Sequence, residues 1–253
     1  DYFLPSLNLK YNLNDKNSFR LGVSKTYTLP QAKEISPYRY VGVNFNSQGN
    51  PNLKPSDHYN LDLKWDFNPT PTELISLTAF YKLIKNPISR IEVASAGGYL
   101  SYENIADKAT VAGVEVEIRK NLFVRPVSNA AHGMNKLSLG LNGSYIYTNA
   151  KMPLATVTTG SQLEGAAPWI VNFDLSHNFT KRERSFVNTL VLNYVSDKIY
   201  TIGTQGYQDM MEQGVLTLDF VSQAKLNKHL SLNLKARNLL NPSYKLSRKA
   251  NEN

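Results

Sequence analysis

The sequence of 253 residues contains no cysteine. This absence excludes a scaffold held together by disulfides and any metal site built from thiolate ligands. A secretory signal is also missing at the start of the chain, because residues 1–5 have neither a basic beginning nor an apolar centre. The first residue is not methionine, and the chain ends in polar sequence at Glu252 and Asn253, so we expect it to be a piece of a longer protein.

Long hydrophobic runs are absent as well. Hydrophobic residues make up 42% of the chain and aromatic residues 11%, which is too apolar for a disordered protein. No stretch approaches the ~18 consecutive apolar residues that a membrane-spanning helix needs. Any membrane-spanning segment must therefore be a strand, and must be recognised from alternation of apolar and polar residues.

Motifs for catalysis and for cofactor binding are missing too. The sequence contains no GxSxG, HExxH, GxxxxGK[ST] or GxGxxG motif. The histidines His58, His132, His177 and His229 are isolated from one another and lack metal-ligand spacing. Glu115 and Glu117 share one face of an expected strand, but the basic residues that follow favour a network of charges over acid–base catalysis. We expect a protein that is not an enzyme, with no metal, no cofactor and, without a basic helix, no nucleic-acid partner.

What the sequence does contain is alternation with a period of two. From His58 to Phe67 every odd position is large and apolar, and every even position is polar or charged. This period predicts a strand with one face toward an apolar medium and the other toward water. Comparable patterns predict roughly ten strands, each near the length of about ten residues expected of a tilted membrane-spanning strand. The other segments are 3–13, 19–27, 74–84, 110–118, 137–147, 169–176, 186–195, 216–220 and 230–236.

The connections between these segments alternate in length. Those near 14–17, 68–72, 180–185 and 227–229 are short, whereas those near 29–57, 85–107, 149–167 and 197–213 are long. Outer-membrane barrels have short periplasmic turns and longer extracellular loops. The connection 121–135 is the exception, being longer than the other turns on its side.

The two faces of the expected strands differ in a way that favours a barrel in a membrane over a soluble β-sandwich. The apolar faces carry aromatic residues, several of them near strand ends, as expected for the belts at the edges of a bilayer. A sandwich would instead have an outward face that is charged and poor in aromatics. The residues predicted to face the lumen are Asn60, Asp62, Lys64, Glu115, Glu117, Asp174, Asp219, Lys235 and Arg237.

Several segments resemble the barrel of TonB-dependent outer-membrane receptors. In that family a GNPxLKPE-like loop precedes a strand, and this chain has GNPNLKPS at 49–56, with Ser56 in place of the glutamate. An FYK strand follows at 80–82, a Tyr-Glu-Asn segment at 102–104 and a GVEVE strand at 113–117. Near the end, the sequence NLLNPSY at 238–244 is similar to the segment before the last strand in the family.

This resemblance implies an all-β, antiparallel transmembrane β-barrel in the bacterial outer membrane, of which residues 1–253 are a C-terminal portion with about ten strands. The family barrel has about 22 strands and is closed by a plug domain that receives energy from TonB. The resemblance implies a receptor that imports a scarce ligand, such as a siderophore or a glycan, and partners that include outer-membrane lipid and the TonB complex. The plug and the final strand are absent from this sequence. A passive or structural barrel, such as a porin or an adhesin, remains open as the alternative, as does a soluble β-rich binding module.

Ligand recognition is expected in the long loops, where tyrosine offers contact area and arginine offers a forked donor for carboxylate or catecholate oxygens. The alternative for the tyrosines is that they anchor the loops at the membrane boundary. The net charge of +8 fits attraction of anionic ligands, contact with lipopolysaccharide phosphates, or simple solvation of the turns. The candidate ligand-binding residues are Tyr38, Arg39, Tyr40, Arg90, Tyr99, Tyr102 and Tyr207.

Overall fold

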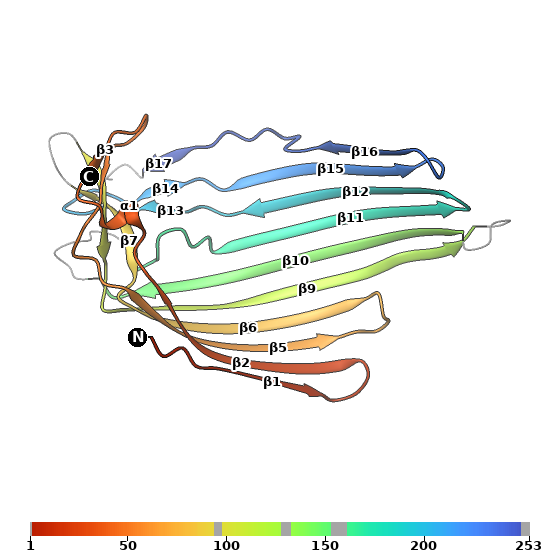
Figure 1. Cartoon of the computed structure of the whole chain (residues 1–253), viewed down its shortest axis with the longest axis horizontal. Helices are drawn as coiled ribbons and strands as arrows, with labels where there is room; N and C mark the ends of the chain where they lie inside the picture. The colour runs from red at the N-terminus through yellow and green to blue at the C-terminus, as the bar shows by residue number, and fades with distance from the viewer. Residues whose placement is uncertain (1, 94–97, 128–132, 153–160, 249–253) are drawn as a thin grey trace.

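The computed structural model of the chain describes residues 2–93, 98–127, 133–152 and 161–248. Ten of the strands that these residues form pair into one antiparallel sheet, and they lie in it in chain order (Figure 1). The expectation of an all-β, antiparallel architecture with about ten wall strands is confirmed. The strands are β1 (Ser6–Asn12), β2 (Asn17–Thr28), β5 (Ser56–Phe67), β6 (Leu74–Lys85), β9 (Lys108–Pro126), β10 (Met134–Ala150), β11 (Trp169–Lys181), β12 (Arg184–Val195), β15 (Val215–Lys225) and β16 (Ser231–Ala236).

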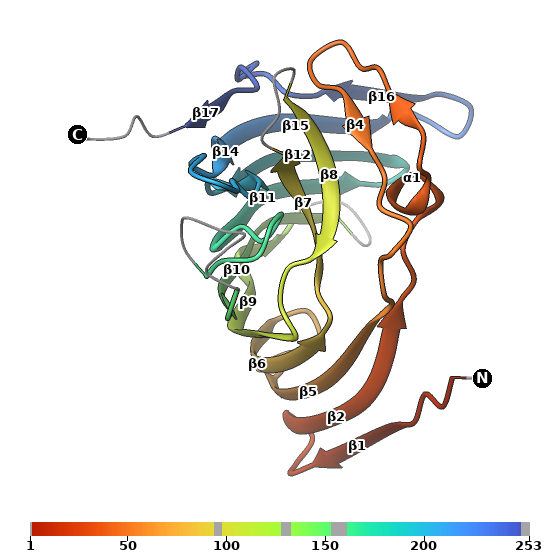
Figure 2. The same ribbon diagram turned by 90° about the vertical axis from the view of Figure 1, so that its left-hand side faces the viewer.

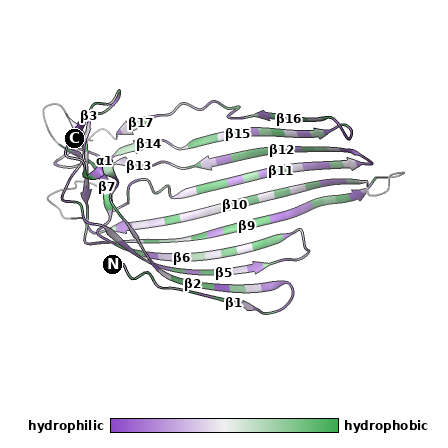
Figure 3. Cartoon of the chain, in the orientation of Figure 1, coloured by the Kyte–Doolittle hydropathy of each residue, from purple (hydrophilic) through white to green (hydrophobic). Residues whose placement is uncertain are grey.

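The sheet curves into a trough, seen from its end in Figure 2, with β1 and β16 as its two edges. In the described part of the chain β1 and β16 do not pair with each other, so the wall is an open part of a barrel. Apolar and polar residues alternate along most of the wall strands (Figure 3). The alternation is weaker in β12, where Leu190, Val191 and Leu192 are consecutive. The expected partial barrel is therefore the observed fold.

Register places the apolar positions of successive strands in continuous rows. Leu63 on β5 lies opposite Leu21 on one side and Ala79 on the other. Large apolar side chains in such rows stay exposed, Leu63 by 52%. In a soluble protein this much exposed apolar surface would be an aggregation hazard, whereas a bilayer solvates it. The row through Leu63 reads Leu9, Leu21, Leu63, Ala79, Val114, Tyr145 and Trp169.

The polar rows lie on the concave face. A hollow of about 570 Å³ on that face is lined by polar side chains that include Lys10, Arg20, Lys64 and Asp66. Asp66 is 5% exposed and forms ion pairs with Arg20 at 3.5 Å and with Lys64 at 3.5 Å. One polar row crosses eight strands through Ser18, Asp66, Ser76, Glu117, Asn142, Asn172, Asn193 and Thr217.

Short turns join the strands at the end of the sheet away from the small sheets described below. The side-chain oxygen of Asn14 accepts hydrogen bonds from the backbone N–H groups of Lys16 and Asn17, both at 2.9 Å. Asn227 does the same for His229 at 2.8 Å and Leu230 at 2.9 Å. These asparagine turns satisfy backbone donors that have no ladder partner, which is why polar residues of this type stand there.

The connection 121–135, whose structure the sequence left open, is largely strand. β9 continues to Pro126 and β10 begins at Met134. The register shifts between Leu137, which pairs with Phe123, and Ser138, which pairs with Asn121. Leu122 therefore has no pairing partner of its own and is an extra residue in β9. Such a bulge reverses the alternation beyond it, so the pattern in the sequence is interrupted at the bulge.

The long connections fold into two small sheets at one end of the trough. One contains β3 (Arg39–Tyr40), β4 (Ser47–Gln48), β8 (Tyr99–Asn104) and β7 (Ile88–Val93), and the other contains β13 (Lys198–Thr201), β14 (Met210–Glu212) and β17 (Leu246–Arg248). The helix α1 (Ala32–Ile35) precedes β3. Among the described residues, no helix has the length and apolar character needed to cross a membrane. The short patterns of these elements were not recognisable in the sequence.

The described buried apolar core lies mainly at this loop end. Ile91, Ile105, Leu163, Ile199 and Ile202 pack together there with small alanines, and Ile202 has no exposed surface. The wall strands contribute to this cluster through residues at their ends, such as Ala109 in β9 and Ala150 in β10. The loop end is thus a folded layer, which we call the loop layer and define as residues 29–55, 86–93, 98–107, 161–168 and 196–214.

Candidate ligand-binding surface

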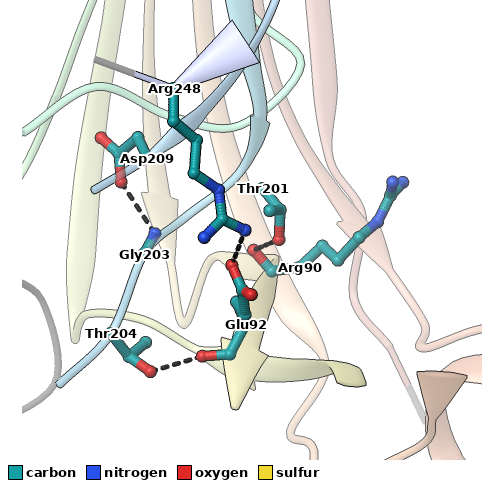
Figure 4. A network of polar contacts seen from close by, with 7 residues as sticks. All are labelled: Arg90, Glu92, Thr201, Gly203, Thr204, Asp209 and Arg248. Atoms are coloured by element: carbon teal, nitrogen blue, oxygen red, sulfur yellow. Dashed lines mark hydrogen bonds and ion pairs between the residues drawn. The ribbon is translucent and has the colours of Figure 1, made fainter. Parts of the chain in front are cut away.

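The loop layer is held together across segments that are far apart in the chain. Ile91 in β7 bridges Ile202, and the backbone N–H of Ile202 donates to the Arg90 carbonyl at 3.0 Å. The backbone N–H of Glu92 donates to the Ile202 carbonyl at 3.0 Å, and the Thr201 hydroxyl donates to the Arg90 carbonyl at 3.2 Å. Figure 4 shows the contact of Thr201 with Arg90 and, beside it, the contact of the Arg248 side chain with Glu92. Two long loops are thereby fixed to each other.

The motif residues of the sequence also hold this layer. The Asn104 side chain donates to the Lys54 carbonyl at 3.0 Å and to the Asn86 carbonyl at 2.9 Å, and its oxygen accepts from the Lys54 N–H at 2.8 Å. The Ser56 hydroxyl donates to the Asn86 carbonyl at 2.7 Å. Asn50 donates from its side chain to the Tyr102 carbonyl at 3.0 Å. The GNPNLKPS and Tyr-Glu-Asn segments therefore meet, and they position the loops at the mouth of the barrel.

Four of the candidate residues gather around β3. The Arg39 guanidinium stacks over the ring of Tyr99 at 5.0 Å, so the first two long loops meet there. The Tyr40 ring lies under the ammonium group of Lys33 at 5.6 Å. Tyr38 is 75% exposed, so most of its side chain faces solvent. A cation over an aromatic face is held in place while its N–H edge stays available to an anion.

Arg90 is more enclosed. Its guanidinium forms an ion pair with Glu164 at 3.3 Å and stacks over the Tyr200 ring at 4.6 Å. Its backbone N–H donates to the same carboxylate at 2.6 Å. Tyr102 stands opposite Arg90 in the β7–β8 ladder. Glu164 and Tyr200 were not expected from the sequence, because each is a single residue in a connection without periodicity.

Burial shifts the acid–base behaviour of this part of the loop layer. Removal from water raises the pKa of Glu164 above its ordinary value, although hydrogen bonding and attraction to Arg90 oppose the change. Burial likewise raises the pKa of Glu103 and, with Arg90 again opposing, that of Tyr102. Protonated Glu164 would leave Arg90 without its counter-charge, so the two groups are linked.

The last candidate, Tyr207, belongs to a third group at the edge of the loop layer. The Arg248 guanidinium lies over its ring at 5.7 Å. Gly203 nearby donates its N–H to Asp209 at 2.8 Å, which closes the loop that carries Tyr207. The structure thus separates the seven candidates into three groups, around Tyr99, around Arg90 and around Tyr207.

The residues expected to face the lumen share the polar side of the sheet. Asn60 donates to the Ser24 hydroxyl at 3.2 Å and, with Asp62 and Glu115, lines a hollow of about 450 Å³. Glu117 forms an ion pair with Arg119 at 2.8 Å. The remaining positions follow from register. Lys64 and Asp174 line other concave hollows, Asp219 and Lys235 share their face through the ladders of β12, β15 and β16, and Arg237 comes one residue after β16 ends.

Close packing on this face requires glycine at Gly113. A Cβ there would lie 2.4 Å from the Tyr145 carbonyl oxygen and 2.4 Å from the Phe80 ring. The Phe80 ring therefore packs directly against the backbone of β9.

Within the described ranges, no three histidine, aspartate or glutamate side chains are placed to hold a metal ion. His177 hydrogen-bonds to Asn135 at 2.8 Å and His58 to Thr28 at 3.0 Å, while His132 lies outside the described residues.

Comparison with known families gives one match that covers most of the chain. Residues 1–239 match the family model described as TonB dependent receptor-like, beta-barrel. The iron-regulated outer membrane virulence protein of Vibrio cholerae serotype O1 is 25% identical over 228 residues, which is 86% of this chain and 32% of that protein. The chain therefore spans about a third of the length of the curated relatives that it matches.

Solved structures share the fold. The siderophore receptor PirA from Acinetobacter baumannii superposes with a TM-score of 0.60 at 18% identity, over 94% of this chain and 36% of that one. The ferric enterobactin receptor PfeA from Pseudomonas aeruginosa, as an R480A/Q482A mutant, superposes with a TM-score of 0.56 at 19% identity, over 94% of this chain and 34% of that one. At these identities the likeness establishes the fold alone.

Proposed function

Since this chain belongs to the TonB dependent receptor-like β-barrel family, we propose that the complete protein is a receptor that captures a scarce ligand outside the cell and imports it with energy from TonB. The observation that carries the proposal is the folded loop layer at one end of a transmembrane wall. A passive pore needs no such layer, whereas a receptor needs side chains held in fixed positions before the ligand arrives. The function is capture and transport, without covalent chemistry.

In this proposal residues 1–253 are a C-terminal portion of the receptor barrel. Coupling to TonB belongs to a plug domain, as the family resemblance implies, and the polar concave face is the surface that would meet the plug. In the polar row of the concave face, the half-buried side chains of Asn142 and Asn172 offer hydrogen bonds to such a domain. Asp66 is buried in its ion pairs with Arg20 and Lys64.

A ferric siderophore is the ligand class that we propose. The curated relative is named as iron-regulated, and two structural neighbours are named as siderophore receptors. Ferric catecholates are anionic and carry aromatic rings. The loop layer offers an arginine held over Tyr99 and the exposed rings of Tyr38 and Tyr40, which suit a ligand with both properties.

Of the two candidate arginines, Arg39 is the better ligand contact. It is exposed, and its described partner is the face of Tyr99, so its N–H donors remain open to an anion. Arg90 already faces the carboxylate of Glu164. We assign to Arg90 the positioning of β7 and Tyr102, and to Tyr207 a peripheral contact on the third group.

Uptake by the complete receptor in cells tests the function. Cells expressing it should accumulate radioactive iron from a ferric catecholate, and deletion of TonB or collapse of the proton gradient should abolish accumulation. A passive barrel would instead admit the chelate regardless of TonB. TonB-independent uptake would therefore refute the proposed coupling.

A second experiment tests the assignment of Arg39 as a ligand contact. Arg39→Ala should weaken binding of the ferric catecholate to the purified receptor by about tenfold or more, since a charge-assisted contact contributes about 1.5–3 kcal/mol. Arg125→Ala is the matched control, because Arg125 stacks over Phe123 at 5.5 Å at the opposite end of the wall. Equal binding by the Arg39 variant and the parent would show that this group is structural.

A further inference from the structure

A hollow of about 370 Å³ lies in the loop layer directly beside the pair formed by Arg39 and Tyr99. It is enclosed by the turn 42–46, which joins β3 to β4, and by the facing ends of β7 and β8. Its volume is within the range of about 300–1,000 Å³ that is usual for small-molecule sites. The residues that line it include Asn44, Phe45, Asn46, Glu92, Tyr99 and Leu100.

The walls of this hollow are fixed by backbone contacts. The N–H of Leu100 donates to the Asn46 carbonyl at 2.9 Å, and Ser47 pairs with Leu100 where β4 lies parallel to β8. A Cβ at Gly42 would lie 2.5 Å from the Phe45 carbonyl oxygen, so the turn closes tightly on itself. The hollow is therefore formed before a ligand arrives, which reduces the entropy that is lost on binding.

The charge of the hollow is balanced. Among its described lining residues Glu92 is the one with a charged side chain, and the Arg248 guanidinium contacts that carboxylate. Arg39, in contrast, holds its guanidinium over the Tyr99 ring with its N–H groups open to an anion. A positive site and a neutral polar site therefore adjoin at Tyr99.

Two side-chain amides determine which chemical group fits the hollow. Within the described residues, the side chains of Asn44 and Asn46 have no hydrogen-bond partner. Each amide offers two donors and one acceptor oxygen. An apolar group seated here would cover these amides without replacing their bonds to water, which costs free energy. Neutral hydroxyl groups would satisfy them, while the rings of Phe45 and Tyr99 offer flat apolar surface to C–H groups.

We propose that this hollow binds a sugar residue, a neutral ring that combines hydroxyl groups with C–H faces, and that the sugar is joined to the anionic chelate held at Arg39. The inference rests on the proposed function and narrows its ligand class to a ferric catecholate that carries a glycosyl substituent. The catecholate contacts Arg39, and the sugar contacts Asn44 and Asn46. Because the two sites share Tyr99 as a border, one ligand occupies both.

Calorimetric titration of the complete, detergent-purified receptor with two ferric complexes tests the inference. One is the ferric complex of a synthetic tris-catechol chelator, and the other is the same complex with glucosyl substituents on the catechol rings. The receptor should bind the glucosylated complex about five- to thirtyfold more tightly, which is the factor that corresponds to two additional hydrogen bonds. Equal affinity for the two complexes, or a preference for the plain one, would overturn the proposal.

The double variant Asn44→Ala, Asn46→Ala should lose this preference and keep the affinity for the plain complex. It leaves the backbone bond from Leu100 to Asn46 in place. Asn52→Ala is the matched control and should keep the preference, because Asn52 is an exposed asparagine of the loop layer away from the described lining of the hollow. Migration of unheated samples on gels reports whether each variant is folded. A folded double variant that keeps the preference, or that binds both complexes equally weakly, would show that the hollow is not a sugar site.

Two further titrations separate the sources of the sugar and the failure of one proposal from that of the other. A glucose oligosaccharide alone should bind far more weakly than the glucosylated complex, because it makes no contact with Arg39. Tight binding of the oligosaccharide, lost in the double variant, would assign the hollow to a free glycan and overturn the proposal. If the receptor binds neither ferric complex, the proposed ligand class fails together with this inference. Equal binding of both complexes removes this inference alone.

Discussion

Arginine at position 63 tests the lipid-facing assignment of the wall. Leu63 lies near the middle of β5, between Leu21 and Ala79 on the neighbouring strands, and 52% of it is exposed. An arginine on the lipid face near the bilayer midplane costs about 2–4 kcal/mol. Since about 1.4 kcal/mol corresponds to a factor of ten, Leu63→Arg should shift the folding equilibrium by a factor between about 30 and 700.

The neighbouring residue provides the control. Asp62 belongs to the concave face and lines two hollows there, so an arginine at this position has room and water. Asp62→Arg should change stability by less than about 1 kcal/mol. Unfolding of the complete receptor by urea in lipid vesicles, followed by the gel migration of unheated samples, measures both variants. Equal losses at the two positions would refute the assignment of the faces.

Three further predictions concern the inside of the structure. Asn104→Ala should lower protection of the loop-layer amides from hydrogen exchange by about tenfold or more, because it removes three hydrogen bonds of about 1 kcal/mol each while the wall stays protected. Gly113→Ala should destabilise the barrel by about 1–3 kcal/mol, whereas Gly143→Ala, where a Cβ meets nothing within 4 Å, should be neutral in the same unfolding assay. The pKa of Glu164 is raised by burial, so its contribution to stability is present below the pKa of the unfolded chain and is lost as pH rises through the higher pKa of the folded state. Exchange of the Arg90–Glu92 amides, corrected for intrinsic rates, should therefore be slower in mild acid than at neutral pH, and Glu164→Gln should remove that difference.

The wall was predictable from sequence because each side chain of a wall strand faces either lipid or water, and the two environments alternate along the strand. The alternation around Leu63 and Asp62 is a direct consequence of this arrangement. The pattern failed at Leu122, where one extra residue in β9 exchanged the two faces, and so the length of β9 and β10 was underestimated. A bulge is set by pairing with the neighbouring strand, which a local pattern does not contain.

The loop layer was predictable only as a location. Its strands have as few as two residues, too short for a period to be recognised. Its contacts join residues more than 70 positions apart. Arg90 donates its backbone N–H to the Glu164 carboxylate, and the Arg90 carbonyl accepts a hydrogen bond from the N–H of Ile202. The sequence therefore indicated Arg39, Arg90 and the tyrosines by residue type, whereas their separation into three groups required the tertiary structure.

The orientation of the loop layer is the central claim, because capture of a ligand from outside requires it. Val43 at its tip is fully exposed, and Asp15 and Glu183 stand in the short turns at the opposite end. Single cysteines at these positions of the complete receptor should be distinguished by a maleimide too large to cross the outer membrane. The account predicts labelling of Val43→Cys on intact cells, and labelling of Asp15→Cys and Glu183→Cys only after the membrane is permeabilised. Labelling of the two turn positions on intact cells, with Val43→Cys protected, would contradict it.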